Sequence, residues 1–276
     1  MTPKPAALGV PDEAMRRLAR IRPGQPADLV TSDLSVNEFL LVREAGFRPL
    51  GLVLGCSIHH LGSQFRRWGR NRELDQLTQA MYQARELAMR RMEAEAQELG
   101  ADGVVGVRLD IEFKDFGSDN AEFIAIGTAV KADAPPPAGG SWHNNRYKPF
   151  TSDLSGQDFW ALIQAGYAPL GMTMGNCVYH VAHRRFRQVI DNIGRNVEIP
   201  QHTEAHYAAR ELAMSRMQAE AEDLGAEGIV GVRLLSNAHR WGGHTTEFFA
   251  IGTAIRPLRA GHVIAKPRLV LPLSDR

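Results

Sequence analysis

The clearest pattern along the chain is a helical repeat of apolar residues between positions 73 and 99. Apolar side chains recur there every three or four residues, which places them on one face of an α-helix. They are Leu77, Ala80, Ala84, Leu87, Ala88, Met92, Ala96 and Leu99. Gly100 follows directly and favours the left-handed backbone that ends many helices. We therefore predict one long helix from about Glu73 to Leu99.

Three β-strands are predicted around this helix. Residues 47–56 are rich in Leu, Val and Gly, which is typical of a buried strand. Residues 103–113 and 122–131 follow the helix and form the next two strands. Alternation predicts that one face of the middle strand carries Val105, Val107, Leu109, Ile111 and Phe113.

A short helix is predicted before the first strand. Ser35 and Glu38 have the spacing of a capping box, and Gly46 offers a place for the helix to end. One unit of the chain therefore reads α-β-α-β-β.

This unit occurs twice. The run Thr-Ser-Asp-Leu-Ser at 31–35 returns at 151–155, an offset of 120, and residues 84–109 return at 209–234, an offset of 125. In the longer stretch 20 of 26 positions are identical. The second copy therefore carries five extra residues, which fall after His180. A period this long indicates a duplicated domain and not a solenoid.

The duplication divides the chain into five parts. Residues 1–30 are an N-terminal extension with a short helix predicted around 11–21, and residues 31–132 are the first unit. Residues 133–150 are rich in Pro and Gly, which is typical of a linker. Residues 151–257 are the second unit. Residues 258–276 form a C-terminal strap, which Pro267 and Pro272 keep from being helical.

Both faces of the predicted sheet are apolar. Leu50, Leu52 and Leu54 alternate with Gly and Val, and no charge lies among them. One long helix covers only one face of a sheet, and monomers rarely expose a large apolar patch. The second face is therefore expected to meet the other unit or another chain.

The block Leu-Gly-Ala-Asp-Gly-Val-Val-Gly-Val at 99–107, with Ala84-Arg85 before it and Gly-Thr-Ala-Val at 127–130 after it, resembles the YbjQ-like family, whose members are described as heavy-metal-binding. The second copy repeats this pattern at 209–210, 224–232 and 252–255. The resemblance implies an α+β fold with a dodecin-like, two-layer β-α-β-β unit that forms pentameric rings. Five chains of two units would then supply ten units, arranged for example as two stacked rings.

Composition excludes several function classes. Charged residues make up 23% of the chain and the net charge is +1, so no strong field attracts nucleic acid, and no nucleic-acid-reading motif occurs. No apolar run is long enough to span a bilayer. Two cysteines cannot form a disulfide framework. These features predict a soluble cytoplasmic protein, and the two apolar faces of its sheet predict that it assembles with itself.

A zinc or copper site is one candidate chemistry, because thiolate and imidazole ligands suit these metals. Two clusters combine them at the end of a strand. They are Cys56, His59 and His60, and Cys177, His180 and His183. However, Cys56 aligns with Asn176 and Cys177 with Ser57, so the two cysteines are predicted on opposite faces of their strands. The alternative is that the cysteines are small buried apolar residues.

An anion or membrane-surface site is the second candidate. Basic residues gather after the first strand of each unit, and around a ring they would form a basic belt. They are Arg66, Arg67 and Arg70 in the first unit and Arg184, Arg185 and Arg187 in the second. The alternative is a solvated basic surface balanced by nearby acids.

No catalytic motif occurs, so we predict that the chain is not an enzyme. Charged residues that match between the copies include Arg85 and Arg210, and Glu95 and Glu220. The most unusual are Arg108 with Glu122 and Arg233 with Glu247, which are charges on apolar strands. They are interpreted as an interfacial Arg–Glu pair that fixes register, or as the lining of a ring pore. The leading hypothesis is a non-enzymatic, ring-forming scaffold or binding protein, and the main alternative is a heavy-metal-binding protein.

Overall fold

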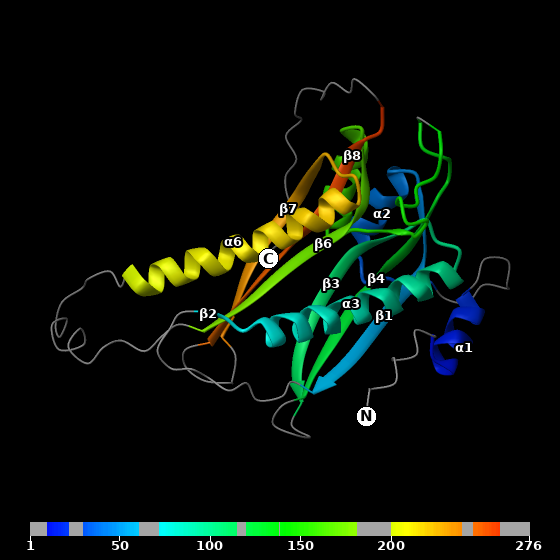
Figure 1. Cartoon of the computed structure of the whole chain (residues 1–276). Helices are drawn as coiled ribbons and strands as arrows, with labels where there is room; N and C mark the ends of the chain where they lie inside the picture. Colours follow the sequence, from blue (N-terminus) through cyan, green and yellow to red (C-terminus); the bar gives the residue numbers. More distant parts are fainter. Residues whose placement is uncertain are drawn as a thin grey trace, which may run out of the picture.

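The computed structural model describes residues 10–21, 30–60, 72–114, 120–137, 139–180, 200–238 and 245–259. These residues form an α+β protein with two four-stranded sheets, each carrying one long helix (Figure 1). The predicted α-β-α-β-β unit is therefore present twice. No described helix is long and apolar enough to cross a membrane.

The first half of the chain contributes an N-terminal helix and the first unit. The elements are α1 (Asp12–Ile21), α2 (Val36–Glu44), β1 (Phe47–His60), β2 (Arg72–Glu73), α3 (Asp75–Glu98), β3 (Gly103–Lys114) and β4 (Asn120–Ala132). The second half begins with a short strand and then repeats the helix–strand–helix–strand–strand order of the unit. Its elements are β5 (Phe150–Thr151), α4 (Gly156–Gln164), β6 (Tyr167–His180), α6 (Pro200–Asp223), β7 (Gly228–Ala238) and β8 (Thr245–Pro257).

The two units exchange short strands. The sheet orders are β1-β4-β3-β5 and β2-β6-β8-β7, so each unit lends one two-residue strand to the sheet of the other. β5 runs parallel to β3, and β2 runs antiparallel to β6. Because backbone hydrogen bonds cross in both directions, the two units are held as one body.

Each long helix lies very close to its own sheet. A Cβ atom added at Gly55 of β1 would lie 2.0 Å from the carbonyl oxygen of Ala88 in α3. The same approach recurs at Gly175 of β6, 2.1 Å from the oxygen of Ala213 in α6. Glycine at these two positions therefore allows the helices to seat on the strands.

The predicted helix ends are confirmed. Ser35 and Glu38 form the capping box that begins α2. Gly46 and Gly100 follow α2 and α3 with φ angles of +84° and +68°, which glycine adopts without strain. Helix α1 also falls where a short N-terminal helix was expected.

The predicted face of β3 is wrong at Val105. A register shift lies between Val105 and Arg108, where Gly106 has a φ of +69°. This bulge turns Val105 toward the cluster that contains Phe47 and Phe150, whereas Val107 joins the core under α3. An extra residue in a strand reverses the alternation, which the period alone does not reveal.

The second face of the sheet in the second unit is covered by the first unit. Met172, Met174 and Val178 of β6 are buried in the same core as the residues of α3. Helix α3 therefore lies between the two sheets and packs on both. The expectation that a second unit covers this face is confirmed for β6.

Candidate functional site at the interface between the units

The N-terminal half of α3 is bonded directly to β6. The amide of Val178 donates to Thr78 Oγ1 over 2.9 Å, and the Asn176 side chain donates to the Thr78 carbonyl over 3.0 Å. The amide of Leu74 completes the contact at the Val178 carbonyl, 2.8 Å away. These bonds satisfy polar groups of β6 that another strand would otherwise bind.

A buried ion pair crosses the same interface. Arg85 of α3 donates to Glu247 of β8 over 2.5 Å, and both side chains are almost fully excluded from solvent. The guanidinium carbon also lies 4.1 Å from the ring centroid of Phe249 and 5.6 Å from that of Phe123. Phe123 and Phe249 come from different units. Arg85 is therefore a cation held between two rings and one carboxylate, which fixes the register of the units.

Side chains of each long helix cap the free edge of its own sheet. In the first unit the amide of Leu54 donates to Glu95, and Arg91 donates to the carbonyl of Cys56. In the second unit the amide of Met174 donates to Glu220, and Arg216 donates to the carbonyl of Asn176. The two copies thus use equivalent residues for the same purpose.

The two capping carboxylates differ in their next partner. Glu95 accepts a hydrogen bond from Arg17 of α1, which also donates to the carbonyl of Leu52 over 2.6 Å. Glu220 instead accepts from the hydroxyl of Tyr82, which comes from α3 of the first unit. Burial raises the pKa of Glu220 to about 7, and Asp223 adds to this rise, while the hydrogen bond from Met174 opposes it.

Two cavities of about 390 and 370 Å³ adjoin Tyr82 and Glu220. The first lies between the start of α3 and α6, with Glu73 and Arg216 in its wall. These two residues form an ion pair of 2.6 Å between the units. The second cavity lies beside the free edge of β6 and extends to the linker at Lys148.

The first predicted metal cluster does not converge. Cys56 and His60 lie on one face of β1, whereas His59 lies on the other, 6.3 Å from Phe123 between ring centroids. The His60 ring is 3.1 Å from the side-chain oxygen of Asn120. Burial, and then the charge of Arg91, lowers the pKa of His59.

The second predicted cluster is only partly described, because His183 lies outside the described residues. Cys177 is buried against Ala209 and Ala213 of α6. Burial, and the nearby carboxylate of Glu73, raise the pKa of its thiol to about 12. His180 is buried at the end of β6. Among the described residues no three His, Cys, Asp or Glu side chains gather as a metal site would require.

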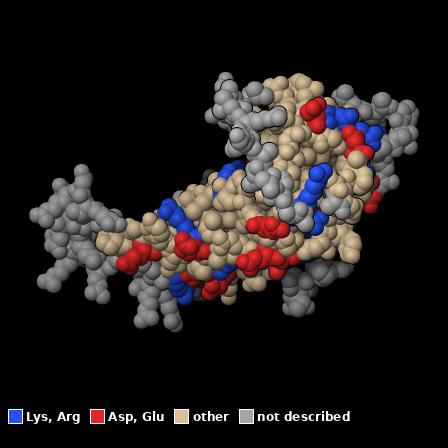
Figure 2. Space-filling view, turned by 90° about the horizontal axis from the view of Figure 1, so that it is seen from above, with Lys and Arg blue, Asp and Glu red and all other residues tan. Residues whose placement is uncertain are grey.

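The predicted anion-binding arginines lie outside the described residues. They are Arg66, Arg67, Arg70, Arg184, Arg185 and Arg187, and the basic belt therefore stays a prediction. On the face seen in Figure 2, the described Lys and Arg side chains are interspersed with Asp and Glu, and neither sign covers the face alone.

The predicted polar pairs are formed with other partners. Arg108 binds Asp33 over 3.2 Å, and Arg233 binds Asp153 over 3.1 Å, each within its own unit. Glu122 is paired in register with Glu112, and the ion pair of Arg108 is with Asp33. Glu247 does belong to a buried interfacial pair, but its partner is Arg85. The sequence did contain a sign of this pair, because Arg85 is a charged residue among the apolar positions of the long helix and Arg210 matches it in the second copy.

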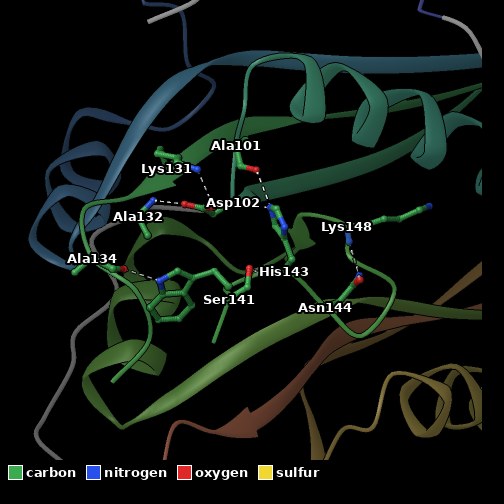
Figure 3. Close-up of polar contacts among 10 residues, drawn as sticks. Ala101, Asp102, Lys131, Ala132, Ala134, Ser141, His143, Asn144 and Lys148 are labelled. Carbon is green, nitrogen blue, oxygen red and sulfur yellow. Dashed lines mark hydrogen bonds and ion pairs between the residues drawn. The ribbon is translucent and has the colours of Figure 1, made fainter. Parts of the chain in front are cut away.

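The linker is folded against the first unit (Figure 3). Trp142 donates to the carbonyl of Ala134 over 2.8 Å, and its ring packs on Phe47 at 4.9 Å. His143 approaches the carbonyl of Ala101, and Asp102 binds Lys131 over 2.9 Å beside it. The linker therefore directs β5 onto β3.

The contacts between the units are head-to-tail and not reciprocal. Arg85 of the first unit is buried against the second, whereas its equivalent Arg210 is exposed. The amide of Val107 in β3 donates to the carbonyl of Ser152 in the second unit and Val107 is buried, whereas its equivalent Val232 of β7 is 43% exposed. Such an interface leaves one unmatched surface at each end of the chain.

The exposed apolar residues mark these two surfaces. At one end, on the face of β1 equivalent to the covered face of β6, Leu54 and Ile58 are 38% and 57% exposed. The other end contains exposed residues of α6 and β7. They are Tyr207, Arg210, Val232, Leu234 and Leu235.

Comparison with protein families finds a match in each unit. The model of the YbjQ family, described as "Putative heavy-metal-binding", matches residues 60–133 and 167–257. Together these segments cover more than half of the chain.

Several known proteins are similar to this chain. The encapsulin nanocompartment protein Rv1762c of Mycobacterium tuberculosis is 49% identical over 245 residues, which cover 89% of this chain and 92% of that protein. A UPF0145 protein of Pseudothermotoga lettingae is 39% identical over 92 residues, covering 30% of this chain and 80% of its own. A UPF0145 protein of Methanococcus maripaludis is 49% identical over 89 residues, covering 30% and 78%. The tandem arrangement therefore extends to the mycobacterial protein, whereas the two UPF0145 proteins match a single segment of this chain.

Proposed function

The chain belongs to the YbjQ family, with the family domain present twice, and from this premise we propose that it is a non-enzymatic scaffold protein that assembles with copies of itself. The observation that carries the proposal is the head-to-tail interface between its two units. An interface of this type repeats from chain to chain until a ring closes or a filament grows.

The two unmatched surfaces have the residues that a repeat of the interface needs. If α6 of one chain meets β1 of the next as α3 meets β6, Arg210 takes the place of Arg85 and approaches Glu122, the equivalent of Glu247. Tyr207 then takes the place of Tyr82 and approaches Glu95. Leu54 and Ile58 would be buried in the positions of Met174 and Val178.

The strand exchange can also repeat. β5 and the residue after it lie along β3, with 2.9 Å hydrogen bonds between the backbones of Ser152, Val104 and Val107. The equivalent segment of the first unit is residues 30–32, and Val30 is 48% exposed. In an assembly this segment would lie along β7 of a neighbouring chain. An unpaired strand edge is otherwise a site for unwanted association.

The name of the mycobacterial relative supports assembly. That protein is called an encapsulin nanocompartment protein, and it shares both units with this chain. We propose that this chain likewise builds, or associates with, a protein compartment. We further propose a closed ring of five chains, which contains ten units.

Native mass spectrometry of the untagged protein, prepared without a chelator, tests this function. We expect a mass near five times the chain mass of 30.5 kDa. A larger closed assembly would support the scaffold function and correct the number of chains. A monomer at micromolar concentration would refute the proposal, because the exposed apolar residues would then have no role in assembly.

Binding of zinc or copper is a second candidate, which the family description favours. The same mass measurement detects bound metal directly, because a stoichiometric metal adds a fixed mass to each chain. We expect Cys56 and His60, which share a face of β1, to contribute if metal is present. Loss of that added mass in Cys56→Ser would identify the site. If Cys56→Ser keeps the added mass, the metal site lies elsewhere in the chain.

A further inference from the structure

The two units differ in what lies beside the capping carboxylate. In the first unit, helix α1 rests against the free edge of β1 and the C-terminal half of α3. Its Leu18 is fully buried, and its Ile21 fills the space above Gly51, where an added Cβ would lie 2.5 Å from Ile21 Cδ1. Arg17 reaches both Glu95 and the carbonyl of Leu52.

The second unit has the equivalent surface, and no helix of the described part of the chain lies on it. Gly171, Met172, Glu220 and Leu224 are the equivalents of Gly51, Leu52, Glu95 and Leu99, which lie at the contact with α1, and all four line the cavity of about 370 Å³. Above Gly171, the described atoms within 4 Å of an added Cβ belong to Leu224 and Thr151, so no described side chain takes the place of Ile21.

The acceptors that bind Arg17 also recur. Glu220 Oε2 accepts the amide of Met174, as Glu95 Oε2 accepts that of Leu54, and in the first unit the same oxygen also binds Arg17. Tyr82 donates to the other oxygen of Glu220, so it leaves Oε2 to a second donor. No described side chain donates to the carbonyl of Met172, the equivalent of Leu52.

The acids around the cavity can hold an added cation, which would stabilise the ionised form of Glu220 against its burial. Two of its acids are already paired, Glu86 with Arg90 and Glu93 with Lys148. Glu220 and Asp223 remain, and Arg146 of the linker is exposed at the rim. A guanidinium placed between Glu220 and the Met172 carbonyl would make two charge-assisted hydrogen bonds, as Arg17 does.

We propose that the cavity beside Glu220 is a binding site for an arginine presented by a short amphipathic helix of a partner protein. The helix would resemble α1, with Arg in contact with Glu220 and, four residues later, an Ile over Gly171. The first unit contains the bound form of this site within the chain itself, and the second unit contains the site open to a partner. This inference does not depend on the proposed ring.

A peptide of residues 10–21, labelled with a fluorophore and titrated with the full-length chain, tests the site by anisotropy. We expect one peptide to bind per chain. The peptide with Arg17→Ala should bind at least about tenfold more weakly, because it loses both charge-assisted bonds. The peptide with Arg16→Ala is the matched control and should bind equally, since the Arg16 side chain is 75% exposed on α1.

Substitutions in the protein locate the peptide. Glu220→Gln should weaken binding about tenfold or more, and Glu95→Gln should not weaken it. The reverse result would mean that the peptide displaces α1 from the first unit, and it would overturn the proposal. Equal binding of the Arg17→Ala peptide, or no binding of the unmodified peptide at millimolar concentration, would overturn it too. Because the peptide variants leave the protein unchanged, the result stands even if Glu220→Gln proves unstable.

Discussion

Arg85 and Glu247 meet across the interface between the units, 2.5 Å apart and both buried, although 162 positions separate them in the sequence. Two nitrogens of Arg85, Nε and Nη2, have no hydrogen-bond partner among the described atoms. The two phenylalanine rings beside the guanidinium replace part of the lost solvation. The pair therefore specifies how the units fit and depends on both partners being present.

Removing the carboxylate alone should be costly. Glu247→Gln leaves a buried guanidinium without its counter-charge, and we expect a loss of about 3–5 kcal/mol in the free energy of unfolding. The double variant Arg85→Met with Glu247→Gln should recover a large part of this loss, because no buried charge remains. Urea denaturation of the four proteins in this cycle measures both effects. If the double variant is as unstable as the sum of the two single variants, the coupling between these residues is absent.

Reversing the charge at Arg210 should break contacts between chains and leave the fold intact. Arg210→Glu would place a carboxylate opposite Glu122 of a neighbour, where like charges repel. We expect the mass measured by light scattering to fall toward that of one chain, with an unchanged circular dichroism spectrum. Arg256→Glu is the control, because its equivalent Lys131 binds Asp102 within one unit. Equal effects of the two substitutions would argue against the interface.

Stability should fall as the pH rises through neutrality. The folded protein keeps the proton of Glu220 up to about pH 7, whereas an unfolded glutamate loses it near 4.5. Between these values the folded state binds more protons, so its stability decreases with rising pH, by an amount on the order of 1–3 kcal/mol. Glu220→Gln imitates the protonated form, and its stability should change less between pH 5 and 8. Parallel pH profiles of the two proteins would contradict this.

The two cysteines should react with alkylating reagents at very different rates. The thiol of Cys177 has a pKa of about 12, so at pH 8 only about one molecule in ten thousand carries the thiolate that reacts. Cys56 is partly exposed in the single chain, on the face of β1 that the proposed contact between chains would cover, so in dilute, dissociated protein it should be modified first. Mass spectrometry during iodoacetamide treatment should detect one added group per native chain and two after unfolding. Cys56→Ser should abolish the fast step.

The sequence alone predicts the parts of the fold that have a long period. The apolar positions of α3 recur over six turns, and the duplication repeats whole elements, so both are recognised without a structure. The two cysteines were expected on opposite faces, and this is confirmed, since Cys177 packs on α6 of its own unit, whereas Cys56 lies on the face of β1 that points away from α3. The glycines after α2 and α3 also act as expected.

The short strands and the contacts between the units could not be predicted from a repeating pattern in the sequence. β2 and β5 contain two residues each, too few for any period, and they pair with strands of the other unit. Glu95 and Glu220 have the appearance of surface helix residues, yet each binds an edge strand. The sequence did not reveal that Arg85 contacts Glu247, because the two residues belong to different copies of the unit. Aligning the copies shows which positions are equivalent, but it does not show which residues of one copy contact the other. Gly106 inside a strand is typical of a bulge or of a close backbone approach, and the sequence does not distinguish the two.

The fusion of two units has a consequence for how an assembly responds to dilution. Within a chain the linker, held by Trp142 and β5, keeps the units together at a high effective concentration, so this junction persists however dilute the protein is. The junction between chains has no such tether and obeys mass action. A ring of these chains therefore contains an even number of units and alternates permanent with reversible joints. Its smallest building block is a preassembled dimer of units, and abundance in the cell sets only whether those blocks join.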